Sequence, residues 1–161
     1  MNAIVMLELQ HREVDDLFNE LESAESPEAR FTVFTQIADA LAIHAAIEEK
    51  HFYPAVNKRP TMDILLESVE EHVEIKRLIA DLLTMDARDE NFDAKLVILQ
   101  GDVEHHVREE EKELFPRVSR LFDEQTLNAV GASMAETQLE MRRAGNPRDV
   151  IPPQTDVAAP L

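Results

Sequence analysis

The chain has 161 residues, a formal net charge of −17 at pH 7 and no cysteine. This length suits one domain that buries its own core, and the lack of cysteine excludes disulfides, thiolate nucleophiles and cysteine-ligated zinc or iron–sulfur sites. The acidic charge argues against nucleic acid and against an anionic membrane surface as partners, because both are bound through Lys and Arg. The first residues turn acidic too soon for a signal peptide, and no apolar run reaches the ~20 residues of a membrane span. We therefore expect a cytoplasmic protein.

The first two helices are predicted from apolar spacing and from a capping signal. Apolar residues and His11 share one helical face over residues 3–22. Ser26 followed by Pro27 is typical of an N-cap with proline at the first helical position, so the second helix is predicted over 27–53. The proline that follows is expected to end or kink this helix.

Three further helices complete the predicted set. The third is predicted over 61–85 and the fourth over 92–115, each with a His inside its apolar stripe. Pro116 is expected to end or kink the fourth helix. A fifth helix is expected over about 124–143. After Gly145 several prolines occur without helical period, which is typical of a flexible tail.

These elements predict an all-α fold. The first four helices are joined by connections of about four to seven residues, and links that short force neighbouring helices to run antiparallel. We predict an up-down-up-down four-helix bundle with an additional C-terminal helix. The bundle domain is expected over residues 1–145, and residues 146–161 are expected to form a flexible proline-rich tail with no fold of its own.

One phrase occurs twice in the chain, at residues 44–54 and 106–116. Each copy has a His, a Glu four residues later, and an aromatic residue directly before a Pro. A lone His precedes each copy by nearly the same distance, so the chain duplicates the pattern His … His-x-x-x-Glu. Imidazole and carboxylate are ligands that first-row transition metals accept.

The polar members of the helical stripes are candidate metal ligands: His11, His44, Glu48, His72, His106 and Glu110. A single buried His is read most simply as a core residue bonded to a carbonyl. At about 1.5 Å rise per residue, however, all six fall in one layer of an antiparallel bundle. Positions i and i+4 share a helix face, so each His-x-x-x-Glu pair projects a nitrogen and a carboxylate inward. Four His and two Glu exceed one tetrahedral zinc site and suit two ions with bridging carboxylates.

In this order of residues, with its Tyr-Pro and Phe-Pro ends, the sequence resembles the hemerythrin-like HHE cation-binding family over roughly residues 3–143. The resemblance implies a non-haem di-iron centre: two iron ions with an oxo or hydroxo bridge, and room for dioxygen, peroxide or nitric oxide. The donor set alone would also accept manganese or zinc. Oxygen-carrying members have a further His where this chain has Lys76. The missing nitrogen leaves a more open coordination position, which favours small-ligand chemistry or turnover over oxygen transport.

We therefore expect a di-iron protein that binds or reacts with a small oxidant, with catalase-like peroxide removal as the favoured outlet and no side chain as nucleophile. Sensing or binding of oxygen, redox state, iron or nitric oxide without turnover stays open. So does a metal-dependent regulatory module that contacts an unknown protein partner. A last alternative is a metal-free polar network, which must be fully satisfied to be tolerated.

Other polar and aromatic residues near the duplicated phrase are less clear. His105 lies on a largely polar face and is expected to be solvated. His51 and Glu113, at matching places in the two copies, are either supporting or access groups below the metal layer or exposed residues at helix ends. Tyr53 and Phe115 are expected to pack at the helix ends; a role of Tyr53 as a radical site or as a hydrogen-bond partner of a ligand stays open, although nothing in the spacing demands it. Three acidic residues are expected at the solvated surface: Glu49, Glu109 and Glu111.

Overall fold

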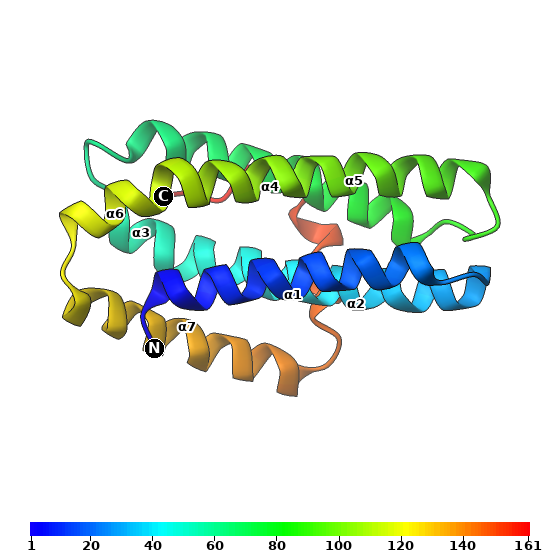
Figure 1. The fold of residues 1–161 in the computed structure, drawn as a ribbon, viewed down its shortest axis with the longest axis horizontal. Helices are drawn as coiled ribbons and strands as arrows, with labels where there is room; N and C mark the ends of the chain where they lie inside the picture. The colour runs from blue at the N-terminus through cyan, green and yellow to red at the C-terminus, as the bar shows by residue number, and fades with distance from the viewer.

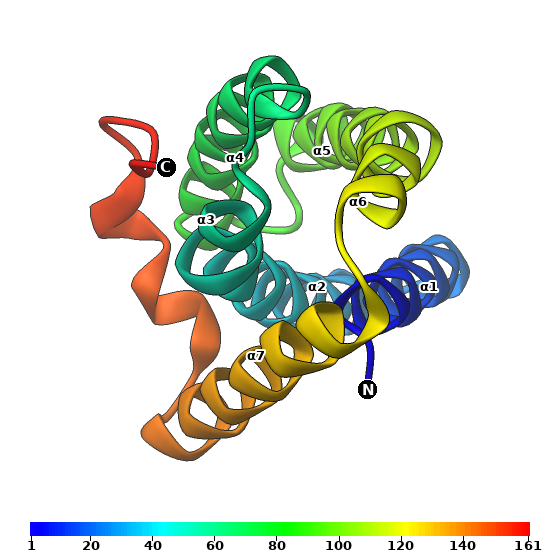
Figure 2. The same ribbon diagram turned by 90° about the vertical axis from the view of Figure 1, so that its left-hand side faces the viewer.

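Four helical rods lie side by side and antiparallel, and a fifth helix packs on the outside of two of them in the computed structural model, which describes residues 1–161 (Figures 1 and 2). The long helices are α1 (Ala3–Ser23), α2 (Pro27–Ile47), α4 (Met62–Leu83), α5 (Glu90–Glu109) and α7 (Glu124–Ala144). Two π-helical turns and two short helices extend the second and fourth rods: η1 (Glu48–Phe52) with α3 (Tyr53–Val56), and η2 (Glu110–Leu114) with α6 (Phe115–Leu121). The predicted bundle with an additional helix is confirmed. None of these helices combines the length and the apolar composition that a membrane span requires.

Side-chain caps fix where the helices begin. An Asn, Asp or Ser side chain accepts a hydrogen bond from a backbone N–H of the first turn in four of them, which satisfies one donor that the helix itself leaves free. These caps are Asn2, Ser26, Asp89 and Asp123. Gly145 ends α7 with φ of 137°, a value that side-chain-bearing residues rarely adopt.

The two prolines of the duplicated phrase lie inside helical rods that run on past them. The helices predicted to end at residues 53 and 115 continue to Val56 and Leu121. Each proline comes two residues after the end of a π turn, η1 or η2, that begins at the Glu of the phrase. The expected helix ends are therefore corrected: Pro54 and Pro116 mark a change of helical pitch.

The π turns explain how the prolines are tolerated. Proline has no N–H, and in an α-helix its ring clashes with the carbonyl four residues earlier. Here the residue before each proline donates its N–H to the carbonyl five residues back, Tyr53 to Glu48 and Phe115 to Glu110. Single π turns of this kind are frequent at functional sites. The wider turn brings residues five apart onto one face.

The apolar core consists of two clusters of 17 buried residues each. One lies toward the end of the bundle that holds α3 and α6 and includes Leu7 and Leu65. The other lies toward the opposite end and includes Phe34 and Ile79. The polar members of the helical stripes occupy the layer between these clusters.

Residues 146–161 pack against the bundle. After Gly145 the chain forms two short 3₁₀ helices, η3 (Pro147–Val150) and η4 (Pro152–Gln154). Ile151 between them is 1% exposed and belongs to the second core cluster. The prediction that this segment has no fold is wrong at these residues, because one isoleucine among the prolines has an apolar place to bury.

Candidate metal centre

The structure brings all six predicted ligand residues into one layer between the two core clusters. Each is at most 5% exposed. They come from four rods: His11 from α1, His44 and Glu48 from the second rod, His72 from α4, and His106 and Glu110 from the fourth rod. The layer predicted from helical rise is therefore present.

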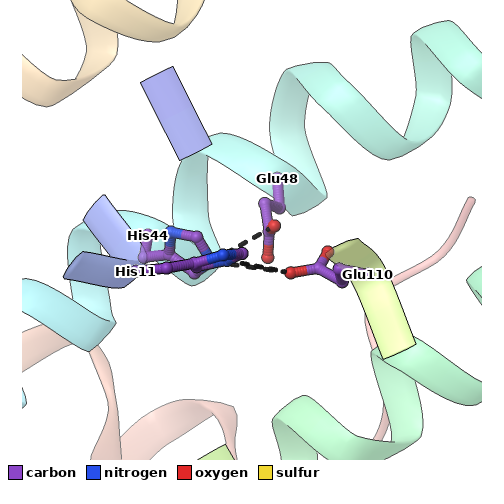
Figure 3. Close-up of side chains that lie close together, drawn as sticks. All are labelled: His11, His44, Glu48 and Glu110. Carbon is purple, nitrogen blue, oxygen red and sulfur yellow. Dashed lines mark ion pairs between the residues drawn. The ribbon is translucent and has the colours of Figure 1, made fainter. Parts of the chain in front are cut away.

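The first group of side chains consists of His11, His44, Glu48 and Glu110, whose ligand atoms point toward one another (Figure 3). Nε2 of His11 lies 3.2 Å from Oε1 of Glu110. Nε2 of His44 lies 3.2 Å from Oε1 of Glu48 and 3.9 Å from Oε1 of Glu110. Two imidazoles and two carboxylate oxygens thus enclose one point.

The second group shares a carboxylate with the first. It contains Nε2 of His72 and Nε2 of His106, 3.1 Å apart, and Oε2 of Glu48, 3.1 Å from His72. Glu48 therefore turns Oε1 to the first group and Oε2 to the second, which is the position of a bridging carboxylate. Oε1 of Glu110 lies 3.4 Å from Nε2 of His106, so this second carboxylate also borders both groups.

The inward atoms fit a cation better than they fit each other. Nε2 of His11 and of His44, and Oε1 of Glu48 and of Glu110, are buried without any hydrogen-bond partner. Such an unsatisfied group costs about 1–3 kcal/mol. Donors at about 2.0–2.2 Å from one ion lie about 3.0 Å apart at right angles and about 3.4 Å apart in a tetrahedron. The spacings of 3.1 and 3.2 Å fall between those values, and the spacing of 3.9 Å corresponds to a wider angle at the ion. The metal-free network is disfavoured, because its pairs His11–Glu110 and His44–Glu48, both at 3.2 Å, make no hydrogen bond of acceptable geometry.

Each histidine is held from behind through its other ring nitrogen. The Nδ1 atoms bond to side-chain oxygens at 2.6–2.8 Å, in the pairs His11–Glu111, His44–Gln10, His72–Glu49 and His106–Glu71. Carboxylate and amide oxygens only accept, so each Nδ1 carries the donated proton and Nε2 is the nitrogen left for a metal. Such outer partners orient the ring and raise its basicity as a ligand.

The outer partners follow the internal duplication. The acidic residue directly after each inward Glu holds the lone His of the other half: Glu49 holds His72, and Glu111 holds His11. The residue directly before each lone His, Gln10 or Glu71, holds the His of a phrase copy. Glu49 and Glu111 were expected at the solvated surface, and this expectation is wrong. The Glu-Glu pair repeated in both copies was the signal that could have identified them.

Tyr53 is the main residue that the sequence interpretation placed wrongly. It was expected to pack at a helix end, yet it is fully buried with its hydroxyl in the second group. The hydroxyl oxygen lies 3.0 Å from Oε2 of Glu48, 2.9 Å from Oε2 of Glu110 and 3.3 Å from Nε2 of His72. Phe115 occupies the matching place in the other half and stacks on the ring of His11, so it packs as expected. The second group therefore has a phenol oxygen beside it, and the first group has none from this pair of residues.

Burial and neighbouring charges control protonation in the layer. Burial alone would lower the pKa of His44, but the charges of Glu48 and Glu110 outweigh it and raise that pKa to about 9. Burial alone would raise the pKa of Glu48, yet the nearby imidazoles, His44 above all, hold it well below its usual value. Burial, with the charges of Glu110 and Glu48, raises the pKa of Tyr53 well above its usual value. Without a metal, the imidazole of His44 is therefore cationic and the phenol neutral.

Lys76 stands where oxygen carriers of the resembled family have a further His. Its side chain is buried, and Nζ donates to both oxygens of Glu49, at 2.8 and 2.9 Å. Glu49 also accepts a hydrogen bond from Nδ1 of His72. Lys76 is thereby bonded to the carboxylate of Glu49. The second group therefore has two imidazole nitrogens, those of His72 and His106.

The remaining predicted residues lie outside the layer. The His105 side chain is 55% exposed beside surface carboxylates, as expected. The Glu113 side chain is 61% exposed and 3.7 Å from Arg117, which supports its interpretation as an exposed helix-end residue. His51 is half-buried, with Nε2 2.7 Å from the hydroxyl of Thr137 on α7. It contacts the added helix rather than the ligand layer.

A cavity of about 30 Å³ adjoins the four histidines. Its walls are mainly apolar side chains of α2, α4 and α5, and Lys76 is the only other ionisable residue in its lining. One water needs about 10–15 Å³, so the cavity holds a molecule of a few atoms.

Comparison with known proteins identifies the family of this chain. The family model for the hemerythrin HHE cation binding domain matches residues 2–118. A protein named DNA nickase from Nostoc sp. strain PCC 7120 is 30% identical over 147 residues; the match covers 90% of this chain and 42% of that protein. The crystal structure of a hemerythrin HHE cation binding domain-containing protein from Mycobacterium kansasii has a TM-score of 0.79, with 22% identity and 89% of each chain covered. That last likeness shows the same fold. Helix α7 and the tail lie beyond the residues matched by the family model.

Proposed function

This chain belongs to the hemerythrin HHE cation-binding family, and from that membership we propose that it is a non-haem di-iron protein that removes hydrogen peroxide in a catalase-like manner. The buried layer of imidazoles and carboxylates suits metal binding. The observation that carries the proposal is a set of ligand atoms buried without partners beside a cavity of peroxide size.

The donors would divide between two ions. His11 and His44 would hold the first ion, and His72 and His106 the second, with the two carboxylates shared. When bound, iron supplies the electron transfers by which one hydrogen peroxide is reduced to two waters while a second is oxidised to dioxygen. Zinc is disfavoured for this role because it has no redox chemistry.

Tyr53 would supply a hydrogen-bond donor at the second group. Its hydroxyl keeps its proton in a buried setting and lies within hydrogen-bonding distance of both shared carboxylates. The hydroxyl oxygen also lies 3.3 Å from Nε2 of His72 and 3.5 Å from Nε2 of His106. A donor held in this way would orient an oxygen ligand.

The cavity limits the ligand to a small neutral molecule. Its mainly apolar walls disfavour a free anion, since a charge loses its hydration there. Lys76, the one ammonium group in the lining, is neutralised by Glu49. Hydrogen peroxide, dioxygen and nitric oxide meet both conditions of size and charge.

A second candidate is a module that binds the same small molecules as a signal, without turnover. The Nostoc relative favours it, because there a domain of this kind lies within a protein more than twice as long as the match. The DNA nicking in that relative's name gains no support here, since the net charge of −17 opposes binding to phosphates.

Metal analysis and a peroxide assay test the proposal together. The purified protein, reconstituted with ferrous iron, should contain two irons per chain and should evolve dioxygen from hydrogen peroxide. Two irons with a stable peroxide or nitric oxide adduct and no dioxygen would select the binding module. A protein that takes up neither iron nor manganese, and whose stability a chelator leaves unchanged, would refute both.

A further inference from the structure

The cavity beside the histidines is closed by the C-terminal segment and not by the bundle alone. Its inner wall includes His44 and His72, and its outer wall includes Val150, Ile151 and Gln154. Those outer residues lie in the part of the chain beyond the family match. The segment runs from the end of α7 past α2 to α4, along one side of the bundle (Figure 2).

One apolar side chain seals this side. Ile151 is 1% exposed, whereas Val150 and Gln154 beside it are exposed. Ile151 belongs to the same apolar cluster as Leu41 of α2 and Ile79 of α4, so it fills the seam between these helices. A gap there would lead directly to the imidazoles.

Two polar contacts hold the segment on either side of that isoleucine. Before it, the Arg148 backbone N–H and guanidinium donate to the two carboxylate oxygens of Asp39, at 2.9 and 2.8 Å. After it, Nε of Arg77 donates to the carbonyl oxygen of Thr155 at 2.8 Å. Between these contacts the segment has two prolines, parts of two 3₁₀ helices and a single buried side chain. A segment with so few buried contacts opens locally at far lower free energy than the bundle.

We propose that residues 148–154 form a stopper over the route to the metal layer, and that Ile151 sets the size of molecule that reaches it. The chemical class admitted is a neutral molecule of a few atoms. The role in substrate selection rests on the proposed function, whereas the control of access holds for whatever metal the layer contains.

A second depression gives the alternative route. It lies between α1 and α5, holds about 310 Å³, and includes His11, Arg108 and Lys112 in its wall. Its lining is polar and charged, which suits ions better than neutral oxidants. Arg108 makes no ion pair, so Arg108→Ala changes this wall with little effect on the fold.

Histidine labelling of the metal-free protein tests the stopper without any redox chemistry. Diethyl pyrocarbonate modifies accessible imidazoles, and peptide mass spectrometry gives a rate for each histidine. His72, which lines the cavity, should react far more slowly than the exposed His105, which serves as reference in the same sample. Ile151→Ala should raise the His72 rate by about tenfold or more, because loss of the buried side chain favours the open segment. The His105 rate should stay constant.

The controls separate the two routes. Asp39→Asn loosens one contact of the stopper while keeping Ile151. It should raise the His72 rate, but less than Ile151→Ala does. If Ile151→Ala fails to fold, Asp39→Asn serves as the test variant in its place. Arg108→Ala should leave the His72 rate unchanged. An unchanged rate in both stopper variants, or an increase with Arg108→Ala, would overturn the proposal.

Size selection is then measured on the iron-loaded protein. The rate with tert-butyl hydroperoxide relative to hydrogen peroxide should rise in Ile151→Ala, and a ratio equal to that of the unmodified chain would refute the size limit. Labelling as expected in a protein that holds no iron would leave the stopper intact and remove the proposed function. Two irons per chain, with no change of the His72 labelling rate in the stopper variants, would keep the proposed function and overturn the stopper.

Discussion

Glu48 and Tyr53 are joined twice across one π turn. The backbone N–H of Tyr53 donates to the carbonyl of Glu48, and the phenol hydroxyl lies 3.0 Å from the carboxylate Oε2 of the same residue. The second bond depends on the first, because the wide turn is what places residues five apart on one face. The π turn that accommodates Pro54 therefore also delivers a hydroxyl to the metal layer.

Tyr53→Phe should separate chemistry from metal binding. The ring still fills its place beside His72, so two irons per chain should remain. Peroxide turnover should fall by roughly tenfold to a hundredfold, because one positioned hydrogen-bond donor is lost. Dioxygen evolution and iron content, measured on the same preparation, check this. Full turnover with full iron would show that the hydroxyl serves packing only.

Glu110→Gln should reduce metal content without a change of shape. The amide keeps the volume of the carboxylate but removes a charge that borders both groups. We expect the loss of at least one ion per chain, measured by elemental analysis after gel filtration. The control is His105→Ala, which removes an exposed histidine directly before His106. This variant should retain both ions. Two ions per chain in Glu110→Gln would show that this carboxylate is not a ligand.

The carboxylates behind the histidines should matter almost as much as the ligands. Glu49→Gln should weaken metal binding by about 10- to 100-fold, the usual effect of an outer partner. Glu111→Gln should have a smaller effect, because the cation beside Glu111 is the exposed Arg12, whereas Glu49 neutralises the buried Lys76. Competition titration with a chelator measures both. Glu113→Gln, at an exposed carboxylate, is the matched control; an equal loss there would point to surface charge as the cause.

Helix α7 should influence the first group of ligands through a chain of amides. Gln10 accepts from Nδ1 of His44 and donates to Oε1 of Gln138 on α7 at 2.6 Å. Gln138→Leu removes the outer bond, so Gln10 is free to turn and the orientation of His44 is less fixed. One of the two ions should bind several-fold more weakly, by about 1 kcal/mol. Titration of cobalt(II) should then resolve two unequal sites; equal sites would show that α7 serves stability alone.

The ligand layer was predictable from sequence because its geometry is that of regular helices. His44 and Glu48 are four residues apart, and the helical period alone places them on one face. Tyr53 was missed because residue i+5 of an α-helix lies about 140° from residue i, and only the π turn brings it back. The proline at position 54 was noticed as a break, yet a proline does not specify which distortion will accommodate it.

The stopper was missed for a different reason. Short 3₁₀ turns have no apolar period, and the proline content of the segment resembles that of disordered chains. The place of Ile151 is set by a seam between α2 and α4, which exists only after the bundle has formed. A tertiary contact made by one residue leaves no local pattern in the sequence.

Metal affinity should rise with pH because protons compete for the inward nitrogens. In the metal-free protein the pKa of His44 is raised from 6.5 to about 9, so at neutral pH its Nε2 carries a proton that a metal must displace. Between pH 6.5 and about 9, affinity for cobalt(II) should therefore increase, by up to about tenfold per pH unit for each proton displaced. Chelator competition at several pH values measures it, and calorimetry in buffers of different ionisation enthalpy counts the protons released.

The stability of the metal-free protein should move in the opposite direction over the same range. A group whose pKa is raised on folding stabilises the fold fully below its unfolded value, and this contribution disappears as pH rises through the folded value. For His44 that window runs from 6.5 to about 9. The urea midpoint of the metal-free protein should thus fall across this window while the affinity for metal rises. An affinity independent of pH, with a constant midpoint, would mean that Nε2 of His44 bears no proton to displace, and its assignment as a ligand beside Glu48 would lose its electrostatic basis.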